Sequence, residues 1–185
     1  TIQAQELLQS AAQIAQSGSN QVIETGHILK AMLSDREGIG VYLMQKAGVN
    51  TENLENELDI ILNKYPRQQG STDSYLSRES AEALQKARDV ANRMGDQFIT
   101  VEHILVGVSS GKDSVAKLLR SAGLNEKLLD KAIEGVRQGR KISSRTEEQT
   151  FDALNKYAIN LNELSVKEKV DPVIGRDDEI RRVLQ

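Results

Sequence analysis

Apolar residues recur at intervals of three and four along most of this chain, which is the period of an amphipathic helix. They line one face over residues 1–16, and the same spacing predicts helices through 27–33, 41–47 and 54–62. Thr51 is the expected N-cap of the last of these helices. Because no segment alternates apolar and polar residues as a strand does, the pattern predicts an all-α protein of short helices.

The chain repeats itself at a fixed spacing. Residues 95–105 match residues 19–29 position for position, and the two histidines give the spacing, 103 − 27 = 76. Apolar positions keep this register on both sides, with a slip to 75 later in the repeat. Self-similarity over this length indicates a duplicated structural unit. We therefore predict two pseudo-symmetric four-helix repeats, at about 1–66 and 77–138.

The pattern changes after residue 138. Residues 139–150 contain one apolar side chain and no periodicity, which predicts a flexible linker. Residues 151–164 again carry an apolar helical stripe, and Pro172 ends that helix. A further helix is expected to begin near Asp177. Because it is still running at Gln185, we expect the chain to be part of a longer protein.

Composition narrows the possible functions. The formal net charge of −3 does not favour nucleic-acid binding, which needs a basic surface. The chain has no cysteine, which excludes disulfides and thiol catalysis and is consistent with a cytoplasmic protein. No apolar run reaches the roughly 20 residues that a membrane span needs. We therefore expect neither nucleic acid nor a membrane among the partners.

Few residues suggest chemistry. His27 and His103 occupy equivalent positions, which favours the same internal packing role in each repeat over a shared metal site. Residues 107–113 resemble a phosphate-binding loop only superficially, because the spacing of the glycines is short by one and Asp113 stands where Ser or Thr is required. We predict no catalytic residue and no metal site.

Asp96 and Glu102 flank the beginning of the central helix of the second repeat. They could serve as helix-capping residues. They could also form an exposed acidic pair beside the apolar Phe98, Ile99 and Val101, which would attract cationic, partly unfolded polypeptide. The first repeat has Asn20 and Gly26 at the matching positions, so both interpretations stay open.

The end of the chain resembles a known family. The run from Asp171 to Asp177, within residues 157–183, is similar to the entry into the first AAA+ module of the Clp ATPases. The duplicated helical unit resembles the amino-terminal domain of that family. Residues 75–79 and 95–99 are most similar to the ClpB-type disaggregases. The resemblance implies a domain that recruits unfolded or aggregated polypeptides for threading by an ATP-driven ring.

The resemblance also implies roles for particular residues. Thr1, Asp96 and Glu102 match positions implicated in substrate handling, to which we add Phe98, Ile99 and Val101 as predicted substrate-binding residues. An incomplete adenine pocket is expected at three further positions, Val173, Ile174 and Gly175. The Walker motifs of the family lie beyond Gln185. The fragment is therefore expected to be no enzyme and to need no cofactor, whereas ATP and Mg would serve the parent chain. The parent is expected to be a homo-hexamer and the fragment a monomer.

Two other functions remain open at this stage. The domain could bind adaptor proteins for an unfoldase that feeds a peptidase, or it could be a purely structural part of the ring. The related ClpC domain receives phosphoarginine at a glutamate in each repeat. Here Glu102 retains that glutamate but Gly26 replaces the other, which argues against a phosphoarginine reader with two sites.

Overall fold

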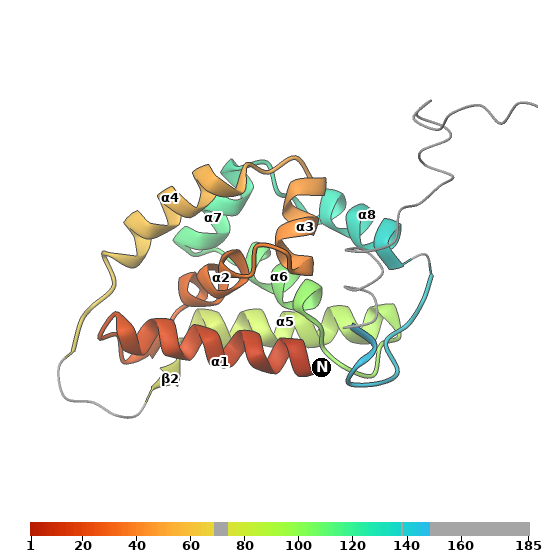
Figure 1. Ribbon diagram of the computed structural model, residues 1–185, viewed down its shortest axis with the longest axis horizontal. Coiled ribbons are helices and arrows are strands. Elements are labelled where there is room, and N and C mark those ends of the chain that lie inside the picture. Colours follow the sequence, from red (N-terminus) through yellow and green to blue (C-terminus); the bar gives the residue numbers. More distant parts are fainter. Residues whose placement is uncertain (69–73, 138, 149–185) are drawn as a thin grey trace, which may run out of the picture.

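The computed structural model describes residues 1–68, 74–137 and 139–148. Within these ranges the chain forms eight helices and two short strands (Figure 1). In chain order the elements are α1 (Ile2–Ser17), β1 (Val22–Ile23), α2 (Thr25–Ser34), α3 (Ile39–Lys46), α4 (Thr51–Leu62), β2 (Tyr75–Leu76), α5 (Arg78–Met94), α6 (Val101–Ser109), α7 (Ser114–Ser121) and α8 (Glu126–Arg137). The sequence-based expectations for residues 151–185, including Val173, Ile174 and Gly175, lie outside the described residues.

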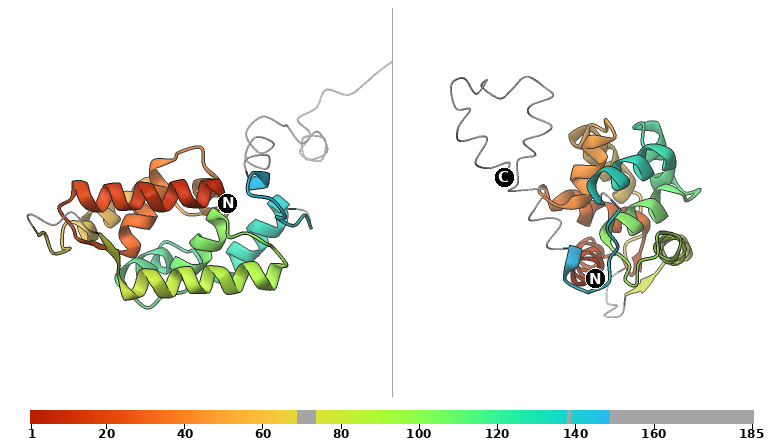
Figure 2. Two further views of the ribbon diagram at one scale, coloured as in Figure 1. Left: turned by 90° about the horizontal axis from the view of Figure 1, so that it is seen from below. Right: turned by 90° about the vertical axis from the view of Figure 1, so that its right-hand side faces the viewer.

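The two repeats form one helical body with a shared core. The central helices α2 and α6 lie between the pair α1 and α5 on one side and the shorter helices α3, α4, α7 and α8 on the other (Figures 1 and 2). Every residue of α6 is buried except Val101, which is half-buried. Apolar side chains from all eight helices make up one contiguous core. The predicted all-α fold of paired four-helix units is confirmed.

Matching cap residues begin the first helix of each repeat. The Thr1 hydroxyl accepts a hydrogen bond from the Ala4 N–H at 3.2 Å, and the Ser77 hydroxyl accepts one from the Ser80 N–H at 3.1 Å. Each satisfies a backbone donor that the first turn of a helix leaves free. One predicted cap is wrong, because the Asn50 side chain caps α4 and Thr51 is the first residue of that helix.

The short strands were not predicted. β1 and β2 pair in parallel, with Val22 opposite Tyr75 and Ile23 opposite Leu76. Two residues are too few to show an alternating pattern, so the sequence gives no signal for this pairing. Among the described residues, no helix is both long and apolar enough to cross a membrane.

The described part of the predicted flexible linker packs against the domain. Ile142 is 1% exposed, its N–H donates to Asp96 Oδ1 at 2.7 Å, and its carbonyl accepts from the Gln97 N–H at 2.9 Å. Figures 1 and 2 both place residues 139–148 beside the amino-terminal end of α1. The structure thus places residues 139–148 against the domain, whereas the sequence predicts a flexible linker over 139–150. The one apolar residue of the segment, Ile142, is buried, and backbone hydrogen bonds support it.

Candidate functional site: an apolar groove and the segment beside it

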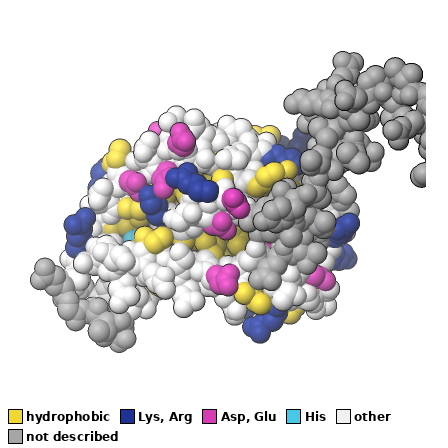
Figure 3. Space-filling view, viewed as in Figure 1, with side chains coloured by type: hydrophobic (Ala, Val, Ile, Leu, Met, Phe, Trp, Pro, Cys, Tyr) yellow, Lys and Arg dark blue, Asp and Glu magenta, His cyan; other side chains and the backbone are white. Residues whose placement is uncertain are grey.

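A groove of about 380 Å³ lies between α1, the α2–α3 connection and the first residue of α6. Its lining includes five apolar side chains, Leu7, Ala31, Met32, Ile39 and Val101. Three of the helices that supply them belong to the first repeat, and α6 supplies Val101 from the second. In Figure 3, apolar surface is visible between α1 and the helices above it. The groove can accept apolar side chains of a partner.

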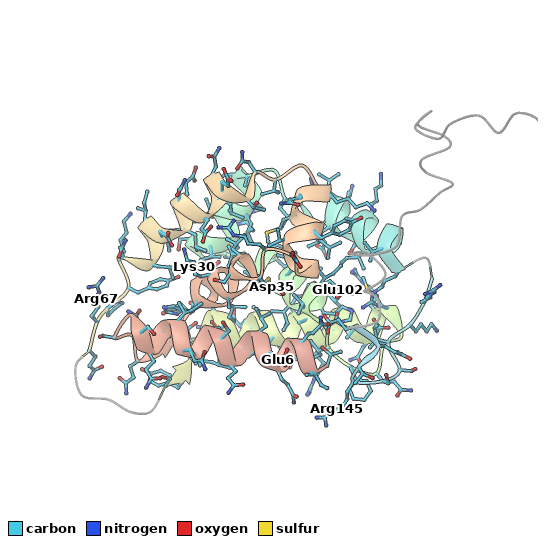
Figure 4. All side chains as sticks on the ribbon, in the orientation of Figure 1. Glu6, Lys30, Asp35, Arg67, Glu102 and Arg145 are labelled. Carbon is cyan, nitrogen blue, oxygen red and sulfur yellow. The ribbon has the colours of Figure 1, made fainter. Side chains whose placement is uncertain are left out.

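The charged residues that line the groove are all acidic. They are Glu6 on α1 and Asp35 at the end of α2, and both are exposed. Figure 4 shows them on either side of the groove, facing the same way. No Lys or Arg is among the lining residues. The rim therefore favours a ligand that carries positive charge beside its apolar part.

A second cleft, of about 540 Å³, lies at the pseudo-symmetric position in the other repeat. The repeat spacing relates the two linings, since 101 − 25 = 76 carries Val101 to Thr25, and the same shift carries Leu7 to Ala83. The second cleft carries more charge, with six charged lining residues, Arg78, Glu79, Glu82, Lys86, Lys112 and Asp113, and we call it the polar cleft. The groove thus carries only acidic charges whereas the polar cleft carries charges of both signs, so the two pseudo-symmetric surfaces differ in charge.

Asp96 and Glu102 do not form an exposed pair. They are 6% and 5% exposed, and the guanidinium of Arg137, at the end of α8, contacts both carboxylates. Arg137 Nε donates to Glu102 Oε1 at 2.8 Å, and Asp96 lies 3.1 Å from His103 Nε2. Of the two interpretations left open by the sequence, the exposed acidic pair is wrong, because both carboxylates are buried against an arginine far along the chain.

The electrostatics of this cluster favour the ion pair. Burial alone would lower the pKa of Arg137, but the adjacent Glu102 and Asp96 outweigh it and raise that pKa, so the guanidinium stays charged. Burial lowers the pKa of His103, which keeps the ring neutral. The His103 Nδ1 accepts the Thr100 N–H at 3.1 Å, which leaves the proton on Nε2, facing Asp96. The cluster holds α8 against the beginning of α6.

Glu148 fastens the end of the described chain to the helices that form the groove. Its Oε1 accepts the N–H of Val101 at 2.7 Å, and the Thr1 hydroxyl hydrogen bonds with its Oε2. Nearby, the Ile2 N–H donates to the Arg145 carbonyl at 3.2 Å. Glu148 is 3% exposed, and burial raises the pKa of its carboxyl to about 7. The Thr1 hydroxyl and the Val101 N–H thus hydrogen bond to the same carboxyl group.

The two histidines pack as predicted. His27 and His103 are 1% and 0% exposed, and in each the Nδ1 accepts a backbone N–H three residues earlier, from Glu24 and Thr100. Burial lowers the pKa of His27 to about 4. The described residues contain no group of three or more potential metal ligands.

Tyr65 occupies the space beside Gly26 that a side chain would need. A Cβ at Gly26 would lie 2.6 Å from the Tyr65 hydroxyl oxygen. The Tyr65 ring packs on His27, with 5.2 Å between the ring centroids. The first repeat therefore has no room for a glutamate at position 26. In the second repeat the equivalent residue is Glu102, which binds Arg137.

Of the predicted substrate-binding residues, only Val101 lines the groove. Phe98 and Ile99 are half-buried in the preceding loop, and Thr1 is 9% exposed. Sequence reasoning missed Leu7, Met32 and Ile39. The repeat itself carries the signal that could have found part of this site, since Leu7 and Val101 correspond to the smaller Ala83 and the polar Thr25 in the other copy.

This geometry defines a class of protein: a tandem helical repeat with an apolar groove and no catalytic constellation among the described residues. The family model of the Clp repeat (R) N-terminal domain matches residues 1–122. The chain belongs to this family.

Known relatives agree with that assignment. The chain is 43% identical over its full length to a chaperone protein ClpB of Bacteroides thetaiotaomicron and 41% identical to one of Porphyromonas gingivalis. It spans 21% of the length of each. The crystal structure of the Hsp104 N-terminal domain from Candida albicans matches with a TM-score of 0.71 at 20% identity, covering 80% of this chain and 97% of that one. That likeness shows the shared fold.

Proposed function

We propose that this domain binds exposed apolar segments of unfolded or aggregated polypeptides and recruits them to a ClpB-type, ATP-driven disaggregase. The observation that carries the proposal is the groove bounded by Leu7, Met32, Ile39 and Val101, whose pseudo-symmetric counterpart carries six charged residues. An exposed apolar surface with an acidic rim supports its assignment as a binding surface.

The size of the groove sets the strength of binding. A volume of about 380 Å³ accommodates a few side chains of an extended segment. Burying one aliphatic side chain contributes about 1.5–3 kcal/mol, and ordering the bound segment offsets much of that gain. Binding is therefore weak and short-lived. This suits a recruiter tethered to a ring, which acts by raising the local concentration of its ligand.

The acidic rim adds a preference among apolar segments. Glu6 and Asp35 attract segments flanked by Lys or Arg and repel segments flanked by Asp or Glu. In this proposal Asp96, Glu102 and Thr1 act indirectly, because they hold the elements around Val101 in place. ATP and Mg serve the AAA+ ring of the longer parent protein. We expect that parent protein to be a homo-hexamer.

A nuclear magnetic resonance titration tests the proposal. The probe is a synthetic peptide in which leucines alternate with serines and both ends carry lysines. Amide shifts concentrated on Leu7, Met32, Ile39 and Val101 support binding in the groove. Shifts confined to the polar cleft, or none at high peptide concentration, contradict it and favour an adaptor-binding or structural role.

A further inference from the structure

The segment 139–148 ties together α1 and α6, two of the helices that line the groove. Glu148 accepts the N–H of Val101 at the beginning of α6 and hydrogen bonds with the hydroxyl of Thr1, which caps α1. The Thr1 hydroxyl also lies 3.2 Å from the Ile99 carbonyl oxygen, in the loop that leads into α6. Val101 lines the groove with its side chain while its backbone binds Glu148.

We propose that Glu148 is a positioning residue for the groove, and that docking of residues 139–148 and binding of an apolar segment strengthen each other. This inference rests on the proposed function of the groove. It adds a route by which ligand binding in the groove could affect the residues that follow, because residue 148 leads directly into the rest of the chain.

The direction of the coupling follows from the docked structure. The groove is open while the segment is docked, so docking does not block it. Glu148 fixes the spacing of α1 and α6 at the groove, which lowers the cost of ordering the site when a ligand binds. By thermodynamic reciprocity, a ligand that binds the docked form more tightly stabilises docking by the same factor.

The surroundings of Glu148 make docking dependent on pH. Burial, together with the nearby Glu102 carboxylate of α6, raises the pKa of Glu148 from its ordinary value of 4.5 to about 7. The hydrogen bonds from Thr1 and Val101 act in the opposite direction and lower that pKa, as does the α-amino group of Thr1, to which Arg145 of the same segment lies close. A protonated Glu148 can donate to the Thr1 hydroxyl while its other oxygen accepts the Val101 N–H.

The sign of the effect follows from this raised pKa. The docked segment binds a proton more tightly than the released segment. Docking is therefore fully favoured below about pH 4.5 and weakens as the pH rises through about 7. His27, with a pKa of about 4, does not titrate near neutral pH.

The test measures binding of the lysine-flanked leucine–serine peptide to the 185-residue chain by fluorescence anisotropy at pH 6 and pH 8. Protection of the Val101 amide from hydrogen exchange, without peptide, reports docking separately. Three variants are compared: Glu148→Ala, Glu148→Gln and, as a matched control on the exposed face of α8, Glu134→Gln. Acetylation of the amino group at Thr1 controls for its own titration.

We expect Glu148→Ala to weaken peptide binding by about fivefold at pH 6 and to expose the Val101 amide, a coupling of ordinary size. Glu148→Gln retains both hydrogen bonds and keeps the same affinity at both pH values, whereas the unmodified chain binds more weakly at pH 8 than at pH 6. Unchanged affinity and pH dependence in Glu148→Ala overturn the inference. If the unmodified chain does not bind the peptide at all, the proposed function fails, while amide exchange still decides whether Glu148 docks the segment.

Discussion

Arg137 and Glu102 are 35 residues apart in the chain, yet Arg137 Nε donates to Glu102 Oε1 at 2.8 Å inside the protein. The same guanidinium contacts Asp96. Two carboxylates that look like a surface feature in the sequence therefore belong to an internal ion cluster that joins α6 and α8. Near the groove, these two carboxylates have a structural role. The ion cluster that they form holds the end of α8 close to the segment that Glu148 docks.

Replacing the arginine is expected to be costly. Arg137→Ala leaves Asp96 and Glu102 buried without their cation, and we expect a loss of about 3–5 kcal/mol in the free energy of unfolding. Urea denaturation measures it. Arg93→Ala is the matched control, because the half-exposed Arg93 pairs with Asp130 at the surface and should cost less than about 1 kcal/mol. Equal losses in the two variants would contradict the assignment of the buried cluster.

Replacing either of two glycines by alanine is expected to change the stability of the protein, in opposite directions at the two positions. At Gly26 a Cβ would lie 2.6 Å from the Tyr65 hydroxyl, so Gly26→Ala should destabilise the protein by about 1–3 kcal/mol. At Gly135, on α8, the nearest atom to a Cβ is the flexible end of Lys46 at 3.4 Å. Gly135→Ala should therefore stabilise the protein by about 0.5–1 kcal/mol, because alanine favours a helix interior.

Thermal unfolding of both variants and of the Gly26→Ala/Tyr65→Phe double variant checks this prediction. Removing the hydroxyl should recover part of the loss at Gly26. A neutral Gly26→Ala change would show that this corner of the first repeat has room for a larger side chain, such as the glutamate of a phosphoarginine reader.

The acidic rim predicts a preference for charge. Reversing it with Glu6→Lys and Asp35→Lys should weaken binding of the lysine-flanked peptide by roughly three- to tenfold at low salt, and added salt should reduce the difference. A peptide with glutamate at both ends should show the opposite change. Glu79→Lys in the polar cleft serves as the control. Equal effects of the rim and control variants would show that net charge alone matters.

Much of the architecture could be predicted from the sequence, because periodicity and the repeat depend on local order along the chain. The eight helices and the internal packing of His27 and His103 follow from it. The ion cluster could not be predicted, since Arg137 meets Asp96 and Glu102 only after the helices pack. The same holds for Glu148, whose partners Thr1 and Val101 come from two separate helices.

The groove is an intermediate case. Val101 was predicted to bind substrate and lines the groove, but Leu7, Met32 and Ile39 come from the first repeat, in which Thr1 was the one residue predicted to bind substrate. Comparing the two copies position by position would have flagged Leu7 against Ala83 and Val101 against Thr25. A position at which the two repeats differ is informative about function, because the fold places the same structural demands on both repeats.

The most direct test replaces one residue of the groove with the residue type found at the equivalent position of the other repeat. Val101→Thr gives the groove the residue of its polar counterpart at nearly unchanged volume, and it keeps the backbone N–H that binds Glu148. Fluorescence anisotropy with the lysine-flanked leucine–serine peptide should show about fivefold weaker binding, or ~1 kcal/mol. Lys112→Ser in the polar cleft should leave the affinity unchanged. Unaltered binding in Val101→Thr, or a loss in Lys112→Ser alone, would contradict the groove as the site where polypeptide binds.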